Sequence, residues 1–234
     1  MSLNPPVLNE AGPVREATGS LLNAFPMPRP EPWKYSGDRE GEGPGPHAQR
    51  EANMGDHIKH EAAVSAAGVV RAFCPDAPRN LLHFLNNSGE PHDMNTNGIL
   101  NDLPSLWGKI KADLKEITNG AINDAKASGY TGSVTYPFVT NWHPEEMQKS
   151  EDLNWHYTVG GYHHATAGTI TVYPDGSYTY RYQVHTADRY NWDSGKIFEI
   201  GPAAVSDTEL QELHRAGISQ EYNLVGESTI RTGP

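Results

Sequence analysis

The chain has 234 residues, enough for one sizeable domain or for one domain with a tail. Asp and Glu total 29 against 18 Lys and Arg, a formal net charge of -11 at pH 7. This balance argues against a nucleic-acid duplex or an anionic membrane as the main partner, although one basic pocket on an acidic protein can still hold a phosphate-bearing molecule. No apolar run reaches the roughly 20 residues that span a bilayer. We also find no ordinary secretory signal, so export would need other machinery.

The composition of the N-terminal segment differs from that of the rest of the chain, and we call this segment the leader. Residues 1–55 are rich in Pro and Gly, which support neither a helix nor a central strand, so we expect an extended or disordered leader or linker. For residues 56–234 we expect an α+β domain. Its helical part covers residues 56–128, and its β-rich part covers residues 129–234.

Helical spacing of apolar residues predicts three helices in the first part of the domain. The first begins near Asp56 and is stopped by Pro75, and the second carries Pro78 in its first turn. The third and longest covers about residues 102–127, with Pro104 in its first turn.

Cys74 is the only cysteine. An intrachain disulfide and a cysteine-based zinc site are therefore excluded. Its apolar neighbours at the end of the first helix predict a buried, inert thiol.

A period of two replaces the helical period in the β-rich part. The clearest unit is a hairpin of residues 168–173 and 178–185, joined by a Pro-Asp-Gly turn in which Pro presets φ and Gly accepts a positive φ. A capping box from Ser206 to Glu209 predicts one further helix. Helices segregated from a mostly antiparallel sheet define the α+β class. Further strands are expected at residues 132–140, 155–162, 196–200 and 222–225.

The densest polar segment covers residues 185–196 and directly follows a predicted strand. Asp188 and Asp193 could form a metal-binding or general acid/base pair there, with Arg189 or Lys196 facing an anionic substrate. Composition alone favours the other interpretation, a solvated hairpin loop whose Asp and Asn side chains bond to the backbone.

Histidine is abundant, with 11 in the chain. His57 and His60 lie one turn apart, but the order His-x-x-His-Glu matches no zinc-peptidase motif, so we expect a polar surface. His163 and His164 are adjacent, so in a strand they point to opposite faces and cannot readily share a metal. His214 lies in the last turn of the capped helix, where a cation would compensate the helix dipole.

Four segments together resemble a known class of proteins. In their order they are similar to C-terminal domains of bacterial polymorphic toxins and secretion-system effectors, and distantly to the colicin M group of bacteriocins. In that group an Asp-x-Tyr-Asp motif and a following His-Arg pair form the active site, on an irregular β-barrel beside a helical region. The resemblance therefore implies a barrel-like sheet. The four segments are residues 82–90, 188–193, 213–215 and 221–226.

The resemblance also implies a set of site residues, with two departures from the pattern. Asn191 stands where the group has its second Asp, and Asp193 is the nearest acidic substitute. The His-Arg pair lies further downstream than in the group. The catalytic residues implied are Asp188, Tyr190, Asn191, Asp193, His214 and Arg215.

The function implied is that of a secreted antibacterial toxin or effector, a metal-dependent hydrolase that cleaves a lipid-linked peptidoglycan precursor between undecaprenol and pyrophosphate in the target cell's periplasm. Asp188 and Asp193 would hold magnesium or another divalent cation. His214 would act as general acid or base, and Arg215 would clamp phosphate oxygens. The expected partners are a cognate immunity protein, secretion machinery that engages the leader, and the cell-envelope substrate, but no nucleic acid.

Two alternatives remain open from the sequence. One is a non-catalytic binding or structural module that uses a Tyr-rich sheet, because Tyr178, Tyr180 and Tyr182 share one face of their strand. The other is a toxin that binds or perforates its target without catalysis.

Overall fold

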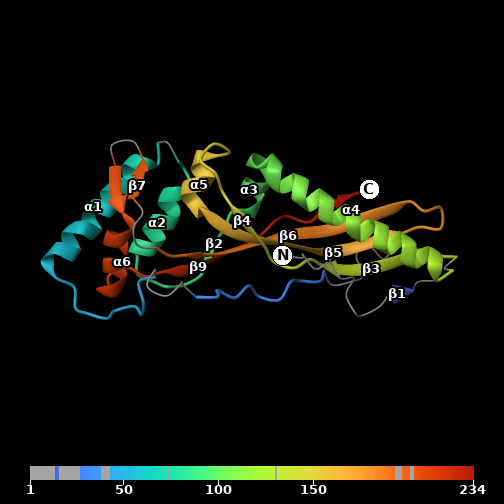
Figure 1. Ribbon diagram of the computed structural model, residues 1–234, viewed down its shortest axis with the longest axis horizontal. Coiled ribbons are helices and arrows are strands. Elements are labelled where there is room, and N and C mark those ends of the chain that lie inside the picture. Colours follow the sequence, from blue (N-terminus) through green and yellow to red (C-terminus); the bar gives the residue numbers. More distant parts are fainter. Residues whose placement is uncertain are drawn as a thin grey trace.

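A computed structural model shows an elongated molecule built around one long hairpin, β5–β6, with α4 along one half and the other large helices at the opposite end (Figure 1). The structure describes residues 14–15, 27–37, 43–72, 74–129, 131–192, 197–200 and 203–234. The helices are α1 (Met54–Val70), α2 (Ala77–Leu85), α3 (Thr96–Asp102), α4 (Pro104–Ala127), α5 (Leu153–Val159) and α6 (Asp207–Arg215). The strands are β1 (Val14–Arg15), β2 (His92–Asp93), β3 (Val134–Val139), β4 (His143–Glu146), β5 (Gly161–Val172), β6 (Tyr178–Tyr190), β7 (Ile197–Ile200), β8 (Ala203–Ser206), β9 (Tyr222–Glu227) and β10 (Arg231–Gly233).

The main sheet has eight strands, in the order β1-β3-β5-β6-β9-β2, with β4 also paired to β5 and β10 also paired to β6. All of its pairs are antiparallel except β2–β9. The α+β prediction is confirmed. Among the described strands the outer members β1 and β2 do not pair with each other, so the sheet is open there and does not close into the implied barrel.

Helix α4 covers one face of the β5–β6 hairpin with an apolar stripe. Leu106 and Ile110 are almost completely buried, as the helical spacing predicts. The predicted start near residue 102 is wrong by a short margin. Leu103 has an extended backbone, with φ −114° and ψ 91°, because it joins α3 to a new helix that begins at Pro104.

The Tyr-rich face of β6 belongs to the protein core. Tyr180 and Tyr182 are each only 7% exposed. The Tyr180 hydroxyl donates a hydrogen bond to the Leu114 carbonyl of α4 at 3.2 Å. The expectation that these tyrosines form an exposed contact face is therefore wrong, because α4 packs over them.

The strand expected at residues 155–162 is wrong, since most of it forms helix α5. The Asp152 carboxylate caps that helix by accepting a hydrogen bond from the Trp155 backbone N–H at 2.8 Å. The Trp155 indole is buried and donates to Asp102 at 2.8 Å. Gly160, with φ +61°, ends the helix and leads into β5.

The leader is extended over residues 27–37 and runs along the sheet face opposite α4 (Figure 1). Arg29 forms an ion pair with Glu227 of β9 at 2.9 Å. Trp33 packs against His163 of β5 with ring centroids 5.0 Å apart. These contacts place the leader against the strands that form the centre of the sheet.

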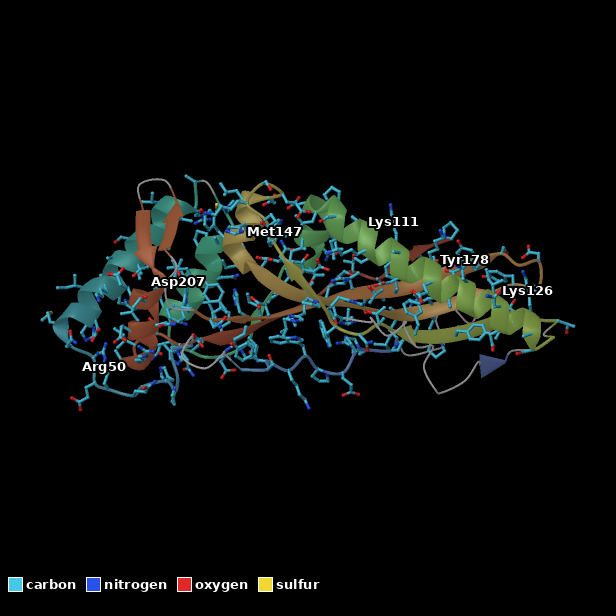
Figure 2. All side chains as sticks on the ribbon, in the orientation of Figure 1. Arg50, Lys111, Lys126, Met147, Tyr178 and Asp207 are labelled. Carbon is cyan, nitrogen blue, oxygen red and sulfur yellow. The ribbon has the colours of Figure 1, made fainter. Side chains whose placement is uncertain are left out.

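Arg50 ties the end of the leader to two helices, at the end of the molecule where Figure 2 labels it. Its guanidinium contacts Asp56 of α1 at 2.6 Å and Glu212 of α6 at 2.9 Å. Asp56 is 4% exposed and also closes a capping box with Asn53. Arg50 and the Asn53 backbone N–H hold the pKa of Asp56 at about 2 despite its burial.

We expect Arg50→Met to lower the free energy of unfolding by about 3 kcal/mol at pH 7, because it leaves the buried Asp56 carboxylate without its cation. Urea unfolding would measure the change. Arg29→Met is the matched control, since it breaks an exposed ion pair and should cost less than about 1 kcal/mol. Equal effects of the two substitutions would contradict this prediction.

Candidate functional site

The four segments on which the resemblance depends meet at one end of the sheet. The Asn87 side chain, after α2, donates a hydrogen bond to the Gly217 carbonyl, after α6, at 2.9 Å. The Tyr222 hydroxyl of β9 donates to the Asn80 carbonyl of α2 at 2.8 Å. Tyr190 of β6 lies opposite Tyr222 in the ladder, and their rings stack 5.0 Å apart. The structure therefore brings distant parts of the sequence together there.

Within this end of the sheet, Asp188 and Tyr190 alternate with Arg189 along β6, so the first two share a face with Tyr222, beneath α2. Arg189 points the other way, and its charge contributes to the lowered pKa of His214. The implied grouping of Asp188 with the His-Arg pair in one pocket stays a prediction.

His214 is buried and neutral. Its Nδ1 accepts a hydrogen bond from the Glu221 backbone N–H at 3.2 Å, so its Nε2–H faces the Gly45 carbonyl of the leader, also at 3.2 Å. Burial, helped by the neighbouring His47, lowers the pKa of His214 to about 4. The helix-dipole interpretation covers both His214 and Arg215. Arg215 is a cation in the last turn of α6 and fits it, whereas the lowered pKa leaves the His214 imidazole uncharged at neutral pH.

The other implied residues are engaged with the leader or lie outside the described residues. Arg215 Nε donates a hydrogen bond to the Pro44 carbonyl at 2.8 Å, and Asn191 Nδ2 donates to the Tyr35 hydroxyl at 3.1 Å. Asp193 lies outside the described residues. Within the described ranges, no three His, Cys, Asp or Glu side chains gather to hold a metal ion. Because Asp193 is one of the two implied ligands, the divalent cation stays a prediction.

A different group of titratable side chains gathers where β4 pairs with β5 beneath α4. His143 and Glu145 share one face of β4 because strand residues alternate, and His143 lies opposite His164 of β5. Lys109 and Asp113 share one side of α4 because they are four residues apart. We call these five residues the acid–base cluster.

Short contacts join the acid–base cluster into two linked pairs. His164 Nδ1 lies 3.3 Å from Glu145 Oε1, and Lys109 contacts the other oxygen of the same carboxylate. His143 Nε2 lies 3.8 Å from Asp113 Oδ2. The two imidazole rings connect the pairs, with centroids 5.3 Å apart.

The two carboxyl groups of the cluster have opposite pKa shifts. Burial raises the pKa of Asp113, and the nearby Glu145 raises it further. Burial would also raise the pKa of Glu145, but His164 and Lys109 outweigh it and the net shift is downward. Two carboxyl groups whose pKa values are shifted in opposite directions are suited to different roles, one as a proton donor and the other as a fixed anion.

His164 is the innermost member, 1% exposed, and neither of its ring nitrogens has a hydrogen-bond partner among the described residues, so its 3.3 Å contact with Glu145 is electrostatic. Its neighbour His163 points to the other face, against Trp33, which confirms that the two histidines do not share a site. The adjacency of His163 and His164 in the sequence therefore gives no sign of the role of His164. The alternation of His143 and Glu145 in the sequence indicates that these two side chains share a face. It does not identify His164 as their neighbour, because that depends on the register between β4 and β5.

Comparisons of the chain with protein-family models, with curated proteins and with solved structures give no match. Among the helices of the described ranges, none combines the length and the apolar character needed to cross a membrane.

Proposed function

We propose that this protein is a hydrolase whose acid and base groups are supplied by the acid–base cluster. The observation that carries the proposal is the geometry of the two linked pairs, His164 with Glu145 and His143 with Asp113, within one partly buried group. Protein interiors rarely hold so many ionisable groups unless they are paired or functional.

The solvent exposure of the side chains in the acid–base cluster indicates which of them could contact a substrate. The side chains of His143 and Asp113 are 29% and 22% exposed, so these two would touch the substrate and the attacking water. The raised pKa of Asp113 suits a general acid, and His143 suits a general base. His164 and Glu145, 1% and 10% exposed, are positioning residues that hold the first pair in place.

The kind of substrate is proposed from the resemblance. Similarity to toxin and effector domains supports a secreted antibacterial protein that acts on a cell-envelope substrate such as a lipid-linked peptidoglycan precursor. The convergence of the four resembling segments at one end of the sheet is consistent with this class. The roles proposed for Asp113 and His143 concern proton transfer, and the divalent cation that the resemblance implies stays a prediction.

Hydrolysis of a lipid-linked peptidoglycan precursor by the purified chain tests the proposal, together with growth of a Gram-negative host that exports the protein to its periplasm. We expect Asp113→Asn and His143→Gln to lower the rate by about 100-fold or more, because general acid–base catalysis contributes that much. Glu116→Gln on the same helix and His57→Gln on α1 are exposed matched controls and should keep full activity.

Two results would contradict the proposal. Full activity of Asp113→Asn and His143→Gln would make the acid–base cluster structural. If Asp188→Ala then abolished activity without unfolding the chain, the site would belong instead to the face of β6 that carries Tyr190. If neither the wild-type chain nor the variants hydrolysed the precursor or slowed growth, the substrate class would be wrong.

A further inference from the structure

A second feature lies on the other flank of α4, beside the C-terminal strand β10. It is an open surface pocket of about 480 Å³ lined by five residues of α4, β6 and β10. We call it the basic pocket. The residues that line it are Trp107, Lys111, Tyr182, Arg231 and Thr232.

The basic pocket does not overlap the acid–base cluster. Trp107 and Lys111 are four residues apart and share one side of α4, as Lys109 and Asp113 do on another. A step of two residues turns a helix by about 200°, so Lys109 projects from the side of α4 opposite Trp107 and Lys111. One helix therefore contributes to two separate polar features.

The charges of the basic pocket are not balanced by acids. Among the described residues, neither Lys111 nor Arg231 forms an ion pair, although the chain carries a net charge of -11. Arg231 is held in place because its guanidinium lies 4.7 Å from the centre of the Trp107 ring. Its Nε is buried without a hydrogen-bond partner within the described ranges. One cation held in place and an exposed lysine beside it make a site for an anion.

The remaining lining residues narrow the chemistry of that anion. Thr232 alternates with Arg231 along β10 and lies opposite Arg181, so its side chain points to the other face of the sheet and supplies no donor here. Burial raises the pKa of Tyr182, which keeps its phenol protonated and able to donate a hydrogen bond. The Trp107 and Tyr182 rings give the pocket an aromatic wall. A phenol donor beside an Arg and a Lys matches the acceptor oxygens of a phosphate group.

We propose that the basic pocket binds a phosphate-bearing ligand, with Lys111 and Arg231 on the phosphate oxygens and the aromatic rings against the organic part. This inference does not depend on the proposed hydrolase activity. Phosphate of this kind could belong to a soluble phosphomonoester or to the headgroup of a phospholipid.

Isothermal titration of the full chain with inorganic phosphate at low ionic strength tests the proposal. We expect Lys111→Gln to weaken binding by about tenfold or more, because it removes a charge-assisted hydrogen bond. Lys126→Gln is the matched control, since Lys126 lies near the other end of the same helix (Figure 2) and should change binding less than about twofold. Asp113→Asn should bind phosphate as the wild type does, which separates this site from the acid–base cluster.

A second arm distinguishes the two sources of phosphate. Vesicles of phosphatidylglycerol that bind the wild type, and bind Lys111→Gln at least tenfold more weakly, would identify a lipid headgroup as the ligand. Binding of free phosphate with no such vesicle binding would identify a soluble phosphomonoester. If neither probe binds, or if Lys111→Gln binds both as well as Lys126→Gln does, the proposal is overturned.

Discussion

Replacing Gly226 by alanine is expected to lower the free energy of unfolding by about 3 kcal/mol or more, the largest stability effect that the structure predicts. A Cβ at this position of β9 would lie 2.0 Å from the Met94 carbonyl oxygen and 2.5 Å from Thr96 Oγ1. Thr96 has little room to move, because its hydroxyl is hydrogen-bonded to Thr186 Oγ1 at 2.6 Å in the buried interior. The clash therefore has to be relieved by shifting backbone, which separates β2 from β9.

Chemical unfolding at pH 7 measures this effect, and Gly108→Ala is its control. Gly108 lies inside α4, and an added Cβ would meet nothing within 4 Å. The same substitution there should stabilise the protein by about 1 kcal/mol, because alanine is the better helix former. A Gly226→Ala variant as stable as the wild type would show that β2 does not pack on β9 as described.

The second large effect is a loss of stability on mild acidification, caused by His214. Its pKa is about 4 in the folded protein, against an ordinary value of 6.5. Between these values the unfolded chain binds a proton that the folded chain excludes, so stability falls as the pH is lowered from 6.5 towards 4. The shift corresponds to about 3 kcal/mol when the transition is complete. The physical cause is burial, which disfavours the charged imidazole, helped by the charge of the neighbouring His47.

Urea unfolding of the wild type and of His214→Gln at pH 7, 5.5 and 4.5 isolates this contribution. Burial also lowers the pKa values of His92, His163 and His185, so the wild type has other losses in the same range. The variant should nevertheless lose clearly less stability than the wild type, whereas the exposed-site variant His57→Gln should follow the wild type. Identical pH dependence in all three proteins would mean that His214 is accessible to protons in the folded state.

The parts of the fold that local signals specify were predictable. The hairpin of β5 and β6 follows from its Pro-Asp-Gly turn, and the helix α6 from its capping box, in which Ser206 and Glu209 bond to each other's backbone as expected. Cys74 is buried, and burial raises the pKa of its thiol. Each of these features depends on residues close in sequence, where propensity and side-chain chemistry agree.

Features that depend on tertiary contacts were not predictable. The Trp and Tyr residues before Gly160 favour a strand by composition, but Trp155 is buried as part of a helix that Asp152 caps. The short strands β2, β4 and β10 acquire their structure from the ladders they join, since none is long enough to show a period. The open sheet likewise follows from which strands meet, and the resemblance alone implied a barrel.

The candidate site also combines features that local sequence predicts with features that depend on tertiary contacts. The acid–base cluster takes Lys109 and Asp113 from α4, His143 and Glu145 from β4, and His164 from β5. Pairs on one element follow from spacing, but the contact of His164 with Glu145 needs the register of two strands. The placement of Asp188 and Arg189 on opposite faces of β6 likewise follows from strand alternation. A motif read along the chain gives the order of its residues and leaves open which side of the sheet each one occupies.

The contacts of the leader have a consequence for where the protein can be shortened. Carbonyl groups of Pro44 and Gly45 accept hydrogen bonds from two side chains of α6, and Arg50 neutralises a buried carboxylate. A fragment that begins at α1 would lose these acceptors and that charge together, which leaves buried polar groups unsatisfied. Limited proteolysis in the leader should therefore yield a less stable product, and the smallest fragment of native stability must begin upstream of Pro44.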